Sequence, residues 1–213
     1  MQKMKVRVTL LEECLGTASS NADIHREFIA SKAPDAETRE EEVARLGADE
    51  VADKGMTVFP RTEDGVPFLY DYQIRGFFKD TASALKRCTG FKTAKLAAHK
   101  KVIDGCIFVD ERIIPFDMHG GEVGNCQRPL RAQTAQGERV ALAESETVPA
   151  GSTLEFTVTC LNDAHMAYVR EWLDYGMYRG LGQWRNSGKG RLVWDELDED
   201  GNVIGGNNEW LKR

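Results

Sequence analysis

The chain has 213 residues, of which 41% are hydrophobic and 29% charged, and its formal net charge is -6. This length suits one folded domain with insertions, and no apolar run approaches the roughly 18 residues of a membrane span. The composition predicts a globular cytoplasmic protein without a membrane anchor. Its five cysteines are scattered and form no C-x-x-C pair, which favours free thiols in a reducing compartment.

The N-terminal stretch alternates apolar and polar residues between Val6 and Leu10, which predicts a first strand ending at Gly16. We expect residues 21–56 to form an inserted, charged, helical or thumb-like element of a single domain that spans residues 1–213. Within it, residues 34–56 contain eight acids and three bases.

A turn at Gly65 separates extended segments, after which a helix is expected that contains Phe77 and Leu85 and is closed by Gly90. Residues 101–116 are expected to form short strands. The chain is next predicted to run strand, turn, strand, turn, strand, with the turns at Gln136-Gly137 and Pro149-Ala150-Gly151 and with Leu154, Phe156, Val158 and Cys160 facing inward.

A helix capped by Asn162 or Asp163 should follow, with Trp172 and Leu173 on its apolar stripe. A glycine-rich stretch ends this helix, and the sequence RLVWDEL predicts a closing strand.

Positive charge is concentrated in one segment of this acidic chain. Residues 79–101 contain seven lysines and arginines and one acid, Asp80. Such a segment is either a solvated helical face or a surface for an anionic partner.

The stretch GLGQWRNSGKGRL, residues 180–192, contains four glycines around Trp184, Arg185 and Lys189. It lacks the spacing and the hydroxyl residue of a Walker A loop, and it follows a helix instead of a strand, unlike a dinucleotide-binding loop. Glycines this dense indicate either a tight turn or the close approach of another backbone or a phosphate.

The pattern G-φ-G-x5-G-x-G between a helix and the last strand resembles the glycine-rich loop of the RAMP superfamily, the RNA-binding proteins of CRISPR systems. The order of turn, strand, helix, loop and strand from Glu146 to Leu197 is similar to that of the family. A second resemblance lies at residues 63–85, where Ile74-Arg75-Gly76 and Lys79 match the family's Leu-Lys-Gly and Arg. Here Asp71-Tyr72-Gln73 replaces Pro-Gly-Ser-Ser.

The resemblance implies an α+β fold with a ferredoxin-like (RRM-like) antiparallel sheet and helices on one face. It implies a CRISPR-associated subunit that binds guide RNA within a complex of other CRISPR-associated subunits or copies of itself. RNA needs cations and amides for its phosphates and flat groups for its bases. The candidate RNA-binding residues are Arg75, Gly76, Lys79, Lys86, Arg87, Lys92, Lys95, Gly180, Gly182, Trp184, Arg185, Gly188, Lys189 and Gly190.

Two other functions remain open at this stage. A metal-independent endoribonuclease would use a histidine, His99 or His25, to activate a 2′-hydroxyl, and Asp23 is a loose analogue of a catalytic loop aspartate. An interaction protein of a phage or mobile element could use the same fold. No cofactor is expected, and the spacing of His119, Glu122 and Cys126 matches no zinc site.

Overall fold

The computed structural model describes residues 1–19, 56–134 and 137–208, and for residues 19, 130–134 and 137–142 it describes the backbone alone. The chain divides into two compact units. Unit 1 comprises Met1–Cys14, Pro60–Glu122 and Val148–Arg213, and unit 2 comprises Leu15–Phe59 and Val123–Thr147. Most of the expected insertion at residues 21–56 lies outside the described residues.

Unit 1 contains a seven-stranded sheet in the order β12-β11-β1-β10-β7-β5, in which β6 also pairs with β10. Its strand pairs are antiparallel. The strands are β1 (Gln2–Leu10), β5 (Phe68–Tyr70), β6 (Ile107–Val109), β7 (Ile113–Asp117), β10 (Thr153–Cys160), β11 (Leu192–Leu197) and β12 (Val203–Gly206).

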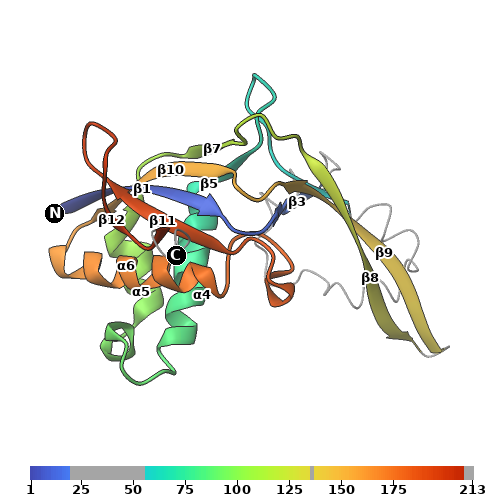
Figure 1. Cartoon of the computed structure of the whole chain (residues 1–213). Helices are drawn as coiled ribbons and strands as arrows, with labels where there is room; N and C mark the ends of the chain where they lie inside the picture. Colours follow the sequence, from blue (N-terminus) through green and yellow to red (C-terminus); the bar gives the residue numbers. More distant parts are fainter. Residues whose placement is uncertain (20–55, 135–136, 209–213) are drawn as a thin grey trace. The chain divides into compact units, whose positions relative to one another are not determined.

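Helices cover one face of this sheet (Figure 1). They are α4 (Asp71–Leu85), α5 (His99–Cys106) and α6 (Met166–Asp174). Short 3-10 turns lie between α4 and α5 (η1, Lys92–Lys95), on either side of α6 (η2, Asp163–His165, and η3, Tyr175–Met177) and before β11 (η4, Arg185–Ser187). With other elements between them, β1, α4, β6, β10, α6 and β11 occur in the chain order β-α-β-β-α-β, which is also the order of a ferredoxin-like unit. The predicted α+β class, with an antiparallel sheet and helices on one face, is confirmed.

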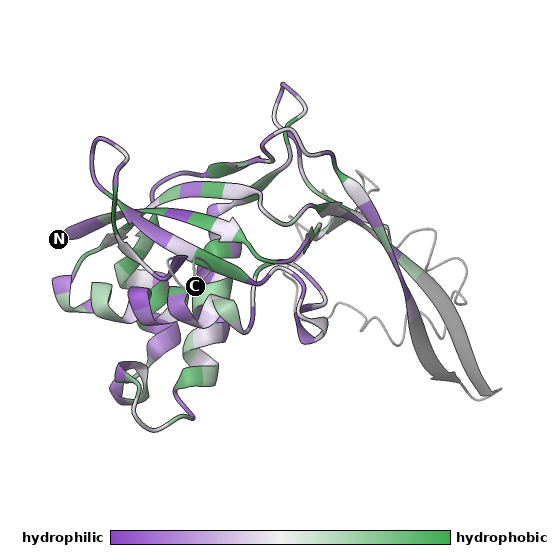
Figure 2. Cartoon of the chain, in the orientation of Figure 1, coloured by the Kyte–Doolittle hydropathy of each residue, from purple (hydrophilic) through white to green (hydrophobic). Residues whose placement is uncertain are grey.

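The core lies between the sheet and the helices because alternate strand residues point toward the helices. Val6 and Val8 of β1 and Phe156 of β10 are buried, as the alternating pattern predicts. The ring of Phe78 in α4 packs 5.6 Å from that of Trp172 in α6, and both side chains are fully buried. Figure 2 shows hydrophobic and hydrophilic residues alternating along the sheet strands.

Four elements differ from the sequence-based expectations, and the first of them is β1, which ends at Leu10 instead of Gly16. The first long helix ends at Leu85, not at Gly90. After it the amide of Arg87 donates to the carbonyl of Ala84, three residues back, in place of the four-residue spacing of an α-helix. Part of the region expected as strands forms α5, whose β-branched residues resemble a strand pattern. The last strand, β12, was not predicted; it follows the acidic turn after β11.

Unit 2 contains β3 (Ala18–Ser19), β4 (Thr57–Val58), β8 (Gly124–Thr134) and all of β9 (Gly137–Val148) except its last residue, and β2 (Cys14–Leu15) is divided between the two units. The β8–β9 pair runs in register from Gly124↔Thr147 to Thr134↔Gly137. This confirms the two predicted strands, whereas residues 135–136 between them lie outside the described part of the chain.

All five cysteines are free thiols. Among the described residues, no helix is long and apolar enough to cross a membrane.

Candidate nucleic-acid interface

Two glycines of the glycine-rich stretch bring the chain against itself. A Cβ on Gly180 would lie 1.6 Å from the carbonyl oxygen of Gly190, and a Cβ on Gly190 would lie 2.0 Å from that of Leu181. The amide of Leu181 donates to Gly190 O at 2.9 Å, and the amide of Gly190 donates to Glu13 O at 2.8 Å. Gly180 and Gly190 are buried, so the close approach they permit is that of the loop to its own ends.

Between these two glycines the loop turns through left-handed residues. Gly182 (φ +75°), Trp184 (φ +53°) and Gly188 (φ +84°) share this conformation, which is costly for residues other than glycine. Trp184 tolerates it at the start of the short turn η4, with 39% of its surface exposed. A Cβ on Gly188 would meet no atom closer than 3.8 Å, so a methyl group there, unlike one on Gly190, would make only an ordinary van der Waals contact.

The cations of the loop are paired with acids. Arg185 Nη1 contacts Asp80 Oδ2 at 2.9 Å, and Lys189 Nζ contacts Glu13 Oε1 at 2.5 Å. Their side chains are 29% and 23% exposed. A phosphate at either cation would therefore compete with a carboxylate that the fold already provides.

The start of α4 carries an acid, Asp71, in the segment where the sequence departs from the family's Pro-Gly-Ser-Ser. Asp71 accepts from Arg75 Nη2 at 2.9 Å and also pairs with Arg112. Because a carboxylate in the first turn already stabilises the helix N-terminus, a second anion is disfavoured there. Gly76 lies in the second turn of α4, where it is exposed and has open space around its Cβ position.

A basic lobe, which we define as residues 86–101, connects α4 to α5. Its anchor is Glu171 of α6, which accepts from the amides of Lys92 at 2.7 Å and Thr93 at 2.8 Å and from the hydroxyl of Thr93. Thr93 is fully buried and accepts in turn from Trp172 Nε1 at 3.0 Å. Lys86 Nζ donates to the carbonyl of Leu96 at 2.7 Å. These contacts hold the lobe against the helical layer.

The lobe concentrates positive charge on the surface. The lobe contains no acid. Within the described part of the chain no carboxylate pairs with its six exposed cations, which are Lys86, Arg87, Lys92, Lys95, Lys100 and Lys101. Phe91, inside the lobe, is 40% exposed. Cations beside an exposed aromatic ring suit a single-stranded nucleic acid.

Among the catalytic candidates, Asp23 and His25 lie outside the described residues. His99 is the first residue of α5, and its Nε2 lies 2.9 Å from Ser83 Oγ. The Ser83 hydroxyl donates to the carbonyl of Lys79 at 2.7 Å, so His99 Nε2–H donates to Ser83. Burial, and then the charges of Lys86 and Lys100, hold the pKa of His99 below its ordinary value of 6.5.

Acidification is expected to weaken the fold through His99. Because the pKa of His99 is lower in the folded protein, the unfolded chain binds the imidazole proton at a higher pH than the folded chain does. The contribution of His99 to the free energy of unfolding is therefore highest above pH 6.5. It decreases as the pH falls from 6.5 through the pKa of His99 in the folded protein. Between about pH 7.5 and about pH 5.5, urea unfolding should show a larger loss of stability for the unmodified protein than for His99→Gln. Equal losses in the two proteins would contradict this assignment.

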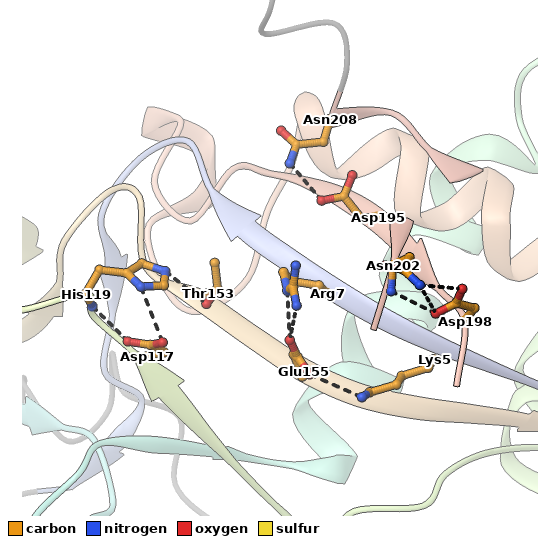
Figure 3. A network of polar contacts seen from close by, with 10 residues as sticks. All are labelled: Lys5, Arg7, Asp117, His119, Thr153, Glu155, Asp195, Asp198, Asn202 and Asn208. Carbon is orange, nitrogen blue, oxygen red and sulfur yellow. Dashed lines mark hydrogen bonds and ion pairs between the residues drawn. The ribbon is translucent and has the colours of Figure 1, made fainter. Parts of the chain in front are cut away.

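The open face of the sheet is polar along β1 and β10 (Figure 3), and Phe108 of the neighbouring strand β6, opposite Thr159, is an exposed aromatic residue on it. Glu155 of β10 pairs with Arg7 at 2.7 Å and Lys5 at 3.6 Å, both on β1. Lys3 pairs with Asp110 at 2.7 Å. An RRM-type sheet stacks bases on aromatic residues of its open face, and the outward positions of β1 and β10 hold none: they are Lys3, Lys5, Arg7, Thr9, Thr153, Glu155, Thr157 and Thr159.

Several exposed aromatic and cationic residues beside the glycine-rich stretch and α4 were not among the RNA-binding residues predicted from the sequence. Tyr178 is 73% exposed, and Arg179 pairs with Asp80 beside Arg185. Near the start of α4, the Arg112 guanidinium lies over the rings of Tyr70 and Tyr72, 5.1 and 5.5 Å from their centroids. Tyr178-Arg179 immediately precedes the first loop glycine, so extending the motif by two residues would have included it.

No known protein family and no curated protein matches the sequence. Among solved structures, 130 chains are similar. A chain of the Type III-B Cmr-beta complex bound to cognate target RNA aligns at a TM-score of 0.52 with 10% identity, covering 92% of this chain and 60% of that chain. A chain of a Type IV-B CRISPR complex aligns at 0.46 with 12% identity, covering 99% of this chain and 98% of that chain. The first similarity shows a shared fold, and this chain spans 60% of the length of that neighbour.

Proposed function

We propose that this protein is a CRISPR-associated, RAMP-like subunit that binds single-stranded RNA, and that its basic lobe supplies the main contacts to the phosphates. The observation that carries the proposal is the lobe itself. In a chain with a net charge of -6, residues 86–101 present six exposed cations without acidic partners in the described residues. Phosphate contacts of this kind dominate the affinity of nucleic-acid binding and make it salt-dependent.

The shared fold and the resemblance of the glycine-rich stretch support the CRISPR association. The neighbour with a TM-score of 0.52 belongs to a complex bound to target RNA. RNA would run along the helical side of unit 1, because the open sheet face offers no aromatic ring on β1 or β10 and its cations are paired with acids. Other CRISPR-associated subunits, or further copies of this chain, are the proposed protein partners.

The test compares two double charge reversals of equal size. Lys92→Glu/Lys95→Glu changes the basic lobe, whereas Lys3→Glu/Lys5→Glu changes the open sheet face. Binding of a fluorescein-labelled oligo-uridine RNA of about 20 nucleotides would be followed by anisotropy between about 50 and 300 mM NaCl. The lobe variant should lose about tenfold in affinity or more, and its log–log salt slope should be shallower by about 1.4, at about 0.7 per cation.

The sheet variant should lose less than about threefold, because its cations are not proposed to touch RNA. Equal losses in the two variants would mean that overall charge alone governs binding. Such a result would contradict the assignment of RNA to the lobe. Thermal unfolding of each variant would verify that both remain folded.

A further inference from the structure

Two arginines converge on a single carboxylate oxygen at the edge of α4. Arg179 Nε lies 2.6 Å and Arg185 Nη1 lies 2.9 Å from Asp80 Oδ2. The side chains of Arg179, Arg185 and Asp80 are 36%, 29% and 33% exposed. One carboxylate between two guanidinium groups leaves one positive charge uncompensated at a partly solvent-accessible point.

We propose that Arg179 and Arg185 form a phosphate-binding site for the RNA strand, and that Asp80 is a built-in competing anion which weakens that site. This inference rests on the proposed function of RNA binding. A guanidinium group has five N–H donors and matches carboxylate and phosphate equally well. Asp80 uses one donor of each arginine, so a phosphodiester can engage the remaining donors and bring the site to neutrality.

The surroundings favour a nucleotide over a simple anion. Each arginine directly follows an exposed aromatic residue: Tyr178 is 73% and Trp184 is 39% exposed. Alternating aromatic and cationic groups allow bases to stack while phosphates are neutralised. Gly76, one helical turn before Asp80 on the same ridge of α4, is exposed and has no atom within 4 Å of a Cβ position. The bare helix surface there leaves room for a strand.

A second carboxylate that lies between two cations, each on a different oxygen, provides a control on another face of unit 1. Glu155 on the open sheet face also bridges two cations, Lys5 and Arg7. Asp80→Asn and Glu155→Gln each remove one negative charge from such a bridge and nearly preserve the shape of the side chain. Only the first should change RNA binding strongly if the site lies at Arg179 and Arg185.

The experiment measures the affinity of the full chain for the labelled oligo-uridine RNA of about 20 nucleotides across the same salt range. Asp80→Asn should raise the affinity roughly threefold to tenfold at low salt and steepen the slope by about 0.7. Glu155→Gln should change the affinity less than about twofold. In an Arg179→Ala/Arg185→Ala background, Asp80→Asn should give no gain, since coupled residues lose their interaction together.

Tyr178→Ala gives an independent readout that does not depend on the stability of the Asp80 variant. Its exposed ring should contribute to base stacking, so its removal should weaken binding about fivefold or more. If the unmodified protein binds RNA and both Asp80→Asn and Tyr178→Ala bind it with the same affinity as the unmodified protein, the inference is wrong. Asp80 would then only stabilise the loop through its ion pairs with Arg179 and Arg185. If no protein in the series binds RNA, the proposed function fails and the inference fails with it.

Discussion

Replacing Gly190 by alanine is expected to lower the free energy of unfolding by about 3 kcal/mol, because the new methyl group meets two penalties at once. Gly190 has φ +69°, and its Cβ position lies 2.0 Å from the carbonyl oxygen of Leu181. Left-handed strain costs roughly 1–2 kcal/mol for an L-residue, and overpacking costs about 1–3 kcal/mol. For a chain of this size the melting temperature should fall by roughly 6–12 °C in a thermal unfolding experiment.

Two neighbouring glycines separate these penalties. Gly188→Ala introduces strain without a collision, since the nearest atom is 3.8 Å away, and should cost about 1 kcal/mol. Gly180→Ala introduces the collision with Gly190 O, without a positive φ, and should cost about 2 kcal/mol. Similar melting temperatures for the Gly188 and Gly190 variants would show that the loop does not pack on itself as described.

Replacing Glu171 by alanine should cost about 3 kcal/mol and loosen the basic lobe. The carboxylate accepts from the amides of Lys92 and Thr93 and from the Thr93 hydroxyl. Thr93 is fully buried, so its donors would have no acceptor in the variant, at roughly 1–3 kcal/mol for each unsatisfied group. Urea unfolding gives the loss of stability, and amide hydrogen exchange across residues 86–101 reports the loosened lobe.

Two variants serve as controls for Glu171. Glu171→Gln retains an acceptor oxygen and should cost only about 1 kcal/mol. Glu155→Ala removes a carboxylate that is 39% exposed and pairs only at the surface, and should cost less than about 1 kcal/mol. An equally small loss for Glu171→Ala would mean that the lobe has its main anchor elsewhere.

The core of this fold was predictable from periodicity, whereas its edges were not. Alternation along β1 and β10 identified Val6 and Phe156 as inward-facing, and both are buried. The helix α5 was taken for a strand because Val102 and Ile103 are β-branched. A short apolar run in the sequence does not distinguish a buried strand from a short helix. In the structure this segment is a helix that packs against α4.

The chemistry of the candidate site was predictable only in part, because its partners are distant in the sequence. The density of loop glycines indicated an unusually close approach, but not that Gly180 and Gly190 approach each other. Asp80 and Arg185 are 105 residues apart, and Glu13 and Lys189 are 176 apart. A local motif therefore cannot show which of its cations are already neutralised. The lobe was predictable because its charges are contiguous.

RNA binding by the intact chain is tested most directly by what the protein carries when it is purified at moderate salt. The ratio of nucleic-acid to protein absorbance and the mass from size-exclusion chromatography would be recorded before and after RNase treatment. We expect a high ratio and a large mass, both of which fall to protein-like values after digestion. A protein-like ratio with an RNase-insensitive mass, together with no salt-sensitive binding of oligo-uridine, would contradict the proposal that the basic lobe binds RNA.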